Sequence, residues 1–256
     1  MWPYPAIPHA LPQLVAVGRL PPVNHEEIQE RATRVLARVH RAAERADRDP
    51  SEVEVLPVTK GHDATSIEAV AGAGFRRVGE NRVAEAEAKR ASLAALDLEW
   101  FMVGHVQRNK AAQVVRVFDR VESVDSLRLA RRLSAEVEKA GIGSLPILVQ
   151  VNASGETSKG GFPVAAGSAS VAELCDLPGL SVEGLMTMAP FVDDEELLRA
   201  VFRRTRELHQ RCRTEIPGYG GTVLSMGMSN DFELAVEEGS TELRLGTILV
   251  GERPGR

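Results

Sequence analysis

Two short stretches near the carboxyl end of the sequence combine glycine with hydroxyl side chains. One is Leu224–Asp231 (LSMGMSND), and the other is Arg244–Thr247 (RLGT), which ends an apolar run. Each reads as a strand that ends in small residues before a helix or turn, where backbone N–H groups and hydroxyls can converge on a phosphate. A Gly/Ser turn would explain either stretch alone, but the pair favours a phosphorylated ligand.

Lys60 is the second candidate for chemistry, because the chain uses only five lysines among its 31 basic residues. It follows the apolar run Val55–Val58, where its ammonium would lose part of its hydration. Desolvation lowers the pKa of a lysine and makes the neutral amine available to attack an aldehyde. Taken alone, Lys60 also fits a snorkelling surface lysine. Combined with a phosphate site, it indicates the aldehyde cofactor pyridoxal 5′-phosphate (PLP).

Hydrophobic periodicity predicts a helix over residues 25–47, followed by eight short strands that alternate with helices. Eight such units favour a closed barrel over an open sheet, and no GxGxxG follows a strand as a Rossmann-type fold requires. We therefore predict an α/β protein, a single (β/α)8 TIM-type barrel with an additional N-terminal helix. The barrel domain is expected over residues 23–256, and residues 1–22 are expected to form a flexible extension. The strands are expected at 53–58, 76–79, 100–103, 120–123, 145–151, 180–186, 222–225 and 242–245.

Active sites of this barrel lie at the carboxyl ends of the strands. Every predicted strand ends at or just before an unusual polar residue. These residues are Lys60, Glu80–Asn81, His105, Asp125, Asn152, Thr187, Ser225 and Thr247. We expect them to share one face of the barrel.

Composition excludes several other classes of protein. The formal charge of −5 gives no overall attraction to nucleic acid or anionic membranes. No apolar run approaches the length of a membrane span, and the first residues lack the basic start of a signal peptide. Cys175 and Cys212 lack the spacing of a metal site or a disulfide framework. A cytoplasmic protein without a metal is therefore expected.

Several segments between residues 53 and 251 resemble the pyridoxal phosphate homeostasis protein family, which is related to the N-terminal barrel of alanine racemase. The matching segments are Pro57–Lys60 (PVTK), Gly79–Glu85 (GENRVAE), Trp100–Lys110 (WFMVGHVQRNK), Val151–Gly160 (VNASGETSKG), Gly184–Pro190 (GLMTMAP) and Leu224–Gly251. The chain departs from the family at Gly61-His62-Asp63, where Thr-Lys-Pro is usual, and at Arg82, where tyrosine is usual.

The resemblance implies that Lys60 holds PLP as a Schiff base, that Asn81 lies near the ring, and that Arg244 faces the pyridine nitrogen. Met186 is expected to pack beneath the ligand. The residues implied for the phosphate are Ser225, Gly227, Gly246 and Thr247. Apo PLP-dependent enzymes are expected as recipients of the cofactor, and the protein is expected to be a monomer. The roles of His62, Arg82, His105 and Lys159 stay open.

An amino-acid racemase of this type needs a second base, which in alanine racemase is a tyrosine of a further domain, whereas this chain offers only Tyr4 and Tyr219. Arg244 keeps its proton, so the pyridine nitrogen would stay unprotonated and the ring would be a weaker electron sink. We therefore predict a PLP carrier or regulator in vitamin B6 homeostasis, without sustained amino-acid turnover. One alternative is a PLP-dependent racemase or lyase of fold type III that uses His105 as a second group. Another is a cofactor-free sugar-phosphate isomerase with Lys60 as its base.

Overall fold

The computed structural model describes residues 25–156 and 160–253. After helix α1 (His25–Arg45), strands and helices alternate along the described chain. The strands of the main series are β1 (Glu54–Pro57), β2 (Arg77–Glu80), β3 (Glu99–Met102), β4 (Arg120–Val124), β5 (Leu145–Asn152), β7 (Leu180–Thr187), β8 (Val223–Ser225) and β9 (Glu242–Leu245). The helices that follow them are α2 (Ala64–Gly72), α3 (Val83–Ser92), α4 (Ala111–Val117), α5 (Leu127–Ala140), α6 (Gly167–Cys175), α7 (Glu195–Glu215), α8 (Phe232–Glu237) and α9 (Thr247–Val250).

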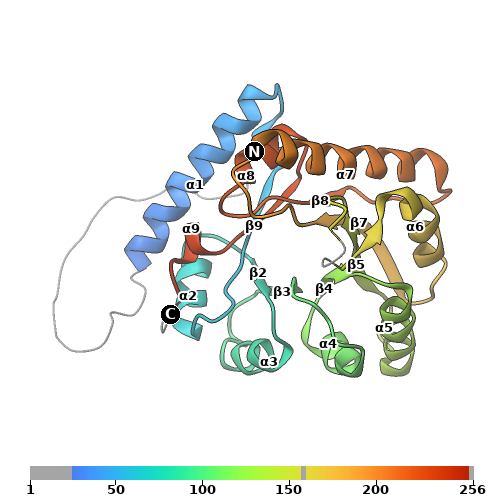
Figure 1. The fold of residues 1–256 in the computed structure, drawn as a ribbon. Helices are drawn as coiled ribbons and strands as arrows, with labels where there is room; N and C mark the ends of the chain where they lie inside the picture. The colour runs from blue at the N-terminus through green and yellow to red at the C-terminus, as the bar shows by residue number, and fades with distance from the viewer. Residues whose placement is uncertain (1–24, 157–159, 254–256) are drawn as a thin grey trace.

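These eight strands form a nearly closed parallel barrel. Hydrogen bonds join them in the order β1-β9-β8-β7-β5-β4-β3-β2. The two ends of this sheet meet at a bridge between Val58 and Gly79, where the Thr59 N–H donates to the Gly79 carbonyl at 3.0 Å. Helices α2 to α7 surround the strands in chain order (Figure 1). The predicted TIM-type barrel with an added N-terminal helix is confirmed.

Short polar side chains cap the starts of several helices. The Asp63 carboxylate accepts from the Ser66 N–H at 3.0 Å, and the Asp194 carboxylate does the same for Leu197 at 3.0 Å. Such N-caps satisfy backbone donors that the first turn of a helix leaves unpaired. The change from strand to helix is therefore encoded locally, on the side of the barrel where the strands end.

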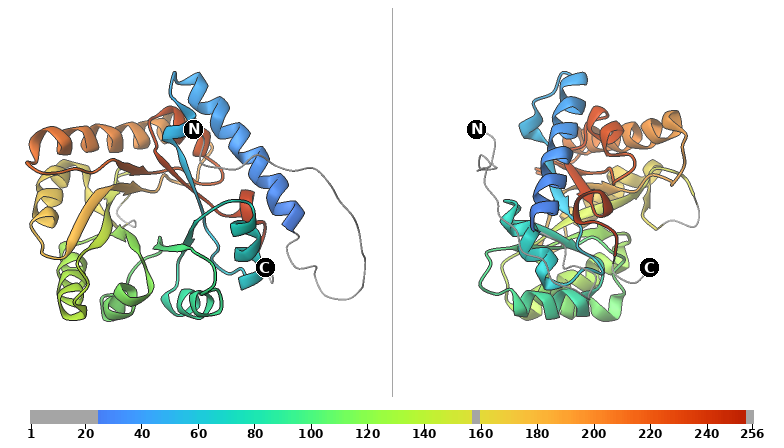
Figure 2. Two further views of the ribbon diagram at one scale, coloured as in Figure 1. Left: turned by 180° about the vertical axis from the view of Figure 1, so that it is seen from behind. Right: turned by 90° about the vertical axis from the view of Figure 1, so that its left-hand side faces the viewer.

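Helix α1 covers one side of the barrel with an apolar stripe. Its residues Ile28, Val35 and Val39 are buried, and the helix packs against α8, α2 and α9. Figure 2 shows α1 lying along this side in both views. The Arg38 guanidinium also donates to Glu233 of α8 at 3.1 Å. The predicted helix is thus part of the folded domain.

Some details were not predicted. A two-residue strand, β6 (Phe162–Pro163), pairs with the end of β5, and helix α9 begins directly after β9. Both are too short to produce a periodic pattern. The predicted extension and Lys159 lie outside the described residues. Within the described chain, no helix is long and apolar enough to cross a membrane, and the two cysteines are free thiols.

Candidate functional site

Lys60 lies at the carboxyl end of β1, between the first and last units of the barrel. The Val58 N–H donates to the Leu245 carbonyl of β9 at 2.9 Å, and the Thr59 N–H donates to Gly79 of β2 at 3.0 Å. Lys60 is half-buried. The backbone that carries Lys60 therefore lies between the ends of β2 and β9, which lead into Asn81 and Gly246.

A buried ion-pair cluster holds the loop that carries Lys60. The Lys89 ammonium donates to Glu80 at 2.7 Å, to Glu85 at 2.6 Å and to the Thr59 carbonyl at 3.1 Å. Glu85 also accepts from the Gly61 N–H at 2.7 Å, and Glu80 accepts from the Thr59 hydroxyl at 2.7 Å. The residues before and after Lys60 are thus tied to the same cluster, which orients the loop.

The pKa values of the two carboxyl groups in this cluster are shifted in opposite directions. Burial raises the pKa of Glu80 in spite of the bonds from Lys89 and Thr59. Burial also acts to raise the pKa of Glu85, but the bonds from Lys89 and Gly61 bring it below its ordinary value. The ammonium of Lys89 is therefore the charge that allows a carboxylate to stay ionised inside this part of the protein.

Asn81 follows β2 on the same face of the barrel. Its side-chain oxygen is buried and has no hydrogen-bond partner among the described residues. Gly104 packs so closely that a Cβ there would lie 2.5 Å from the Asn81 carbonyl oxygen. The loop after β3 is thus pressed against Asn81, and the unpaired oxygen offers an acceptor to a bound molecule.

The first turn of α9 and Ser229 form a second group of polar atoms on this face. The Ser229 hydroxyl lies 3.5 Å from the Ile248 N–H. Thr247 is exposed at the start of α9, and a Cβ on Gly246 would lie 3.5 Å from the Val58 carbonyl oxygen. The N–H groups at the very start of a helix lack a partner in the preceding turn, and from the third residue of α9 onward the N–H of Leu249 donates to the Gly246 carbonyl at 2.9 Å. This arrangement is suited to an anion beside Lys60.

Ser225 lies inside the barrel instead of on the loop. Its hydroxyl donates to Glu122 at 2.7 Å and accepts from Arg244 at 2.6 Å. The Arg244 guanidinium also donates to the carbonyls of Ser225 and Thr187, at 2.6 and 2.7 Å. Met186 is buried and pairs in register with Ser225. The structure therefore brings Ser225, Arg244 and Met186 together within the barrel.

The backbone conformation and close packing at position 227 require a glycine. Its φ is +98°, a conformation that favours glycine, and a Cβ there would lie 2.6 Å from Ala235 of α8. The residue allows the chain to turn from β8 toward Ser229.

Among the other sequence candidates, the His105 ring is 71% exposed and pairs with Asp125 at 3.0 Å. Asn152 organises the loop after β5, because its side chain bonds to Ser154, Gly155 and the Glu156 carbonyl. His62 is buried, and burial lowers its pKa. No group of three His, Cys, Asp or Glu residues that could hold a metal occurs in the described chain.

Sequence reasoning missed a set of charged residues in the barrel interior. Arg120 and Glu122 of β4 and Glu242 of β9 are buried there together with Arg244. Arg120 donates to Glu122 at 2.8 Å and pairs with Glu242. The sequence did contain a signal for this set, because Arg120 and Glu122, and likewise Glu242 and Arg244, are two residues apart on a predicted strand. Alternate residues of a strand point to one face, so each pair is expected on the same side of the sheet.

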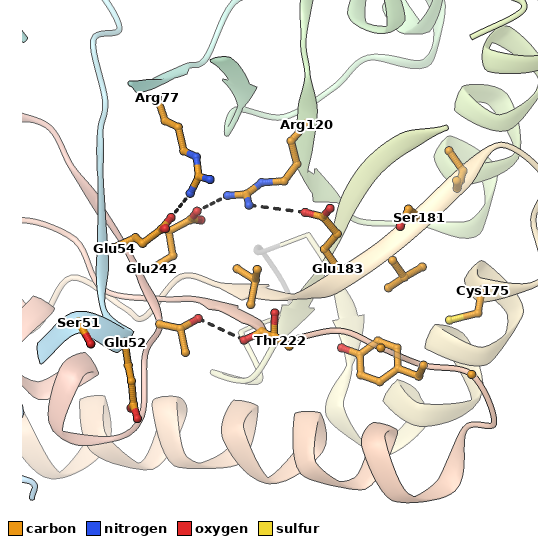
Figure 3. Close-up of a pocket in the computed structure, with 17 residues that line it drawn as sticks. Ser51, Glu52, Glu54, Arg77, Arg120, Cys175, Ser181, Glu183, Thr222 and Glu242 are labelled. Atoms are coloured by element: carbon orange, nitrogen blue, oxygen red, sulfur yellow. Dashed lines mark hydrogen bonds and ion pairs between the residues drawn. The ribbon is translucent and has the colours of Figure 1, made fainter. Parts of the chain in front are cut away.

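A cleft of about 870 Å³ opens at the opposite, amino-terminal face of the barrel. Figure 3 shows its two arginines held by carboxylates, with Arg77 on Glu54 and with Arg120 on Glu242 and Glu183. Tyr219 also lines this cleft and is hydrogen-bonded to His209 at 3.1 Å. The only tyrosine of the described chain is therefore at the far end of the barrel from Lys60.

Comparison with known proteins agrees with this architecture. Residues 32–254 match the family described as alanine racemase, N-terminal domain. A pyridoxal phosphate homeostasis protein of Pseudomonas aeruginosa is 40% identical over 226 residues, which cover 88% of this chain and 96% of that protein. PipY of Synechococcus elongatus PCC7942, solved with PLP bound, is 36% identical with a TM-score of 0.76, covering 88% of this chain and 100% of PipY. Alanine racemase of Clostridium difficile 630 is 16% identical with a TM-score of 0.68, over 88% of this chain and 58% of that one, and shares the fold.

The ion-pair cluster under the Lys60 loop generates a stability prediction. We expect Lys89→Met to lower the free energy of unfolding by about 3–5 kcal/mol, because it leaves the buried Glu80 carboxylate without a cation. Adding Glu80→Gln to that variant should recover part of the loss, since the unpaired charge is then gone. Urea unfolding measures both effects, with Lys139→Met on the exposed side of α5 as the control. A loss below about 1 kcal/mol for Lys89→Met, as for an exposed ion pair, would contradict the assignment.

Proposed function

The chain belongs to the family of pyridoxal phosphate homeostasis proteins, and from that premise we propose that it binds PLP and acts in PLP (vitamin B6) homeostasis. The observation that carries the proposal is the place of Lys60. Its backbone lies between the ends of β2 and β9. β2 leads into Asn81, whose side-chain oxygen lacks a partner among the described residues, and β9 leads into the start of α9, which lies beside Ser229. We propose that Lys60 holds the cofactor as a Schiff base.

The residues on this face suit the chemical groups of PLP. A primary amine suits the aldehyde, and hydroxyls together with the backbone N–H groups at the start of α9 suit the phosphate dianion. Arg244 suits the pyridine nitrogen, because a guanidinium donates hydrogen bonds and keeps its proton at physiological pH. When bound, the cofactor supplies a reactive aldehyde and an electron-withdrawing ring. The protein supplies the amine, the anion site and the fixed positive charge.

We propose that the phosphate is held by Gly246, Thr247 and Ser229. The sequence prediction named Ser225 in place of Ser229. The hydroxyl of Ser225 already has a donor in Arg244 and an acceptor in Glu122 inside the barrel, whereas the Ser229 hydroxyl lies at the start of α9. We assign Gly227 to the turn that presents Ser229, and Met186 to the packing of the barrel interior.

We propose that the protein carries PLP without sustained amino-acid turnover. A racemase needs a second base near the cofactor, and Tyr219 is buried at the opposite face, where it bonds to His209. The charge of Arg244 disfavours protonation of the ring nitrogen, and an unprotonated ring is the poorer electron sink. Both features favour holding the cofactor over turnover.

Recipients of the cofactor and a monomeric state stay predictions. The loop after β7 exposes Met188, Phe191 and Val192 on the face that also carries Lys60, and Phe191 is 88% exposed. Because these apolar side chains are exposed, this loop is the first place to substitute in a test for contact with apo PLP-dependent enzymes.

The Schiff-base proposal is tested by absorbance and chemical trapping. With PLP, the wild-type protein should absorb near the violet edge of the visible range, and borohydride reduction followed by peptide mapping should label Lys60. We expect Lys60→Ala to lose this absorbance while its circular dichroism is unchanged, and Lys110→Ala, an exposed lysine, to keep it. Labelling of Lys110 or Lys159 with Lys60 unmodified would refute the assignment.

The phosphate assignment is tested by comparing PLP with pyridoxal. A neutral hydrogen bond contributes about 0.5–1.5 kcal/mol and one to a charged acceptor about 1.5–3 kcal/mol. The variant Ser229→Ala/Thr247→Val should therefore weaken PLP binding by roughly tenfold or more, with little effect on pyridoxal. Ser225→Ala serves as the contrast and should affect the two ligands equally. An equal loss for both ligands in the Ser229/Thr247 variant would remove these residues from the phosphate site.

The carrier proposal is tested by α-proton exchange and racemisation of a panel of amino acids by the PLP-loaded protein. We expect no sustained turnover. Turnover on the order of 10 per second, the typical rate of an enzyme, would establish the racemase or lyase alternative. Replacing Arg244 with Glu should raise any slow exchange, because a carboxylate favours the protonated ring nitrogen.

A further inference from the structure

A chain of charged and polar side chains runs along the barrel interior to Arg244. Glu122 accepts from Arg120 on one carboxylate oxygen, at 2.8 Å, and from the Ser225 hydroxyl on the other, at 2.7 Å. The Ser225 oxygen in turn accepts from Arg244 at 2.6 Å. All four side chains are buried. One hydroxyl therefore links the Glu122 carboxylate to the Arg244 guanidinium.

The other hydrogen bonds of Arg244 go to uncharged carbonyl groups, those of Ser225 and Thr187. Glu122 is thus a carboxylate that this guanidinium reaches through a single side chain, and the Ser225 hydroxyl also interacts with Glu242, whose pKa it lowers. Because both groups are shielded from water, a change in the charge of Glu122 is felt strongly at Arg244.

We propose that Glu122 is a positioning residue for the cofactor site. Through the Ser225 hydroxyl it holds the Arg244 guanidinium in place, and its charge sets how strongly Arg244 acts on the pyridine nitrogen of bound PLP. The inference rests on the proposed function, in which Arg244 faces that nitrogen.

The surroundings of Glu122 allow its charge to change near neutral pH. Burial and the neighbouring carboxylate of Glu242 raise the pKa of Glu122 to about 7, against the opposing effect of Arg120 and Arg244. Burial also acts to raise the pKa of Glu242, but Arg120 brings it below its ordinary value. Glu242 therefore stays ionised while Glu122 titrates.

Two further carboxylates, on other elements of the fold, lie near the two ends of this series of hydrogen-bonded side chains. Glu183 of β7 lies 3.7 Å from Arg120, at the amino-terminal cleft shown in Figure 3. Asp231, before α8, acts on Arg244 through its charge. Neither is hydrogen-bonded to Glu122 in the described structure, so Glu183 provides a control that alters the same network without altering the link to Arg244.

The experiment uses the PLP-loaded protein with ¹⁵N in the pyridine ring, and follows the ¹⁵N chemical shift from pH 5.5 to 8.5. In the wild type we expect a step near pH 7, toward the value of a less strongly hydrogen-bonded nitrogen as Glu122 ionises. Glu122→Gln should abolish the step, and Ser225→Ala should reduce it because the link to Arg244 is broken. Glu183→Gln should retain it.

A second measurement needs no cofactor. A carboxyl group whose pKa is higher in the folded than in the unfolded protein stabilises the fold at low pH, and this contribution is lost as the pH rises through about 7. The midpoint temperature of apo Glu122→Gln, relative to the wild type, should therefore rise between pH 5 and pH 8, by roughly 2–4 °C or more. An unchanged difference would overturn the titration of Glu122.

The outcomes separate this inference from the proposed function. If PLP is not trapped on Lys60, the proposed function fails, while the apo measurement still decides whether Glu122 titrates. If PLP is bound through Lys60 but the wild type shows no step, or Glu122→Gln keeps it, Glu122 does not act on Arg244 and the inference is refuted. A step that is lost in Glu122→Gln and kept in Glu183→Gln supports it.

Discussion

A positive charge inside a barrel of parallel strands must be neutralised and hydrogen-bonded, because an uncompensated buried charge costs several kcal/mol. Arg244 imposes this constraint here. Its guanidinium lies in the layer that branched apolar side chains usually fill in such barrels. The chain meets the constraint with Glu122 and Glu242, which also balance Arg120, and with the Ser225 hydroxyl. The interior of this barrel is thus partly an electrostatic network.

The buried charge of Lys89, beside the loop that carries Lys60, must also be neutralised and hydrogen-bonded. Lys89 can be buried because Glu80 and Glu85 accept its hydrogen bonds, and these carboxylates also hold Thr59 and Gly61. The two clusters therefore act on different parts of one face. In our proposal the inner cluster holds Arg244 in place, and the outer one holds the backbone that carries Lys60. Preorganisation of this kind lowers the cost of binding a rigid, charged ligand.

The two faces of the barrel consequently differ in what they offer a ligand. At the amino-terminal face, the arginines are already paired with carboxylates and the tyrosine is bonded to a histidine. At the carboxyl-terminal face, the Asn81 oxygen lacks a partner in the described structure, and the Ser229 hydroxyl lies 3.5 Å from the Ile248 N–H at the start of α9. The arginines and the tyrosine of the amino-terminal cleft are thus already paired, and Lys60 lies at the opposite face.

The barrel, the added helix and the face on which Lys60, Asn81 and Thr247 lie could be predicted from the sequence, because strand and helix periods and the position of a residue after its strand are local properties. It could not show which partners the hydroxyls of Ser225 and Ser229 have, since both are small residues on either side of Gly227 and their partners are distant in the chain. The bonds of Ser225 to Glu122 and Arg244, which stand 103 and 19 residues away in the chain, became visible only in the folded protein. The charge network was beyond the sequence for the same reason: the pairing of Arg120 with Glu242 depends on closing the barrel, which brings together strands that are distant in the chain.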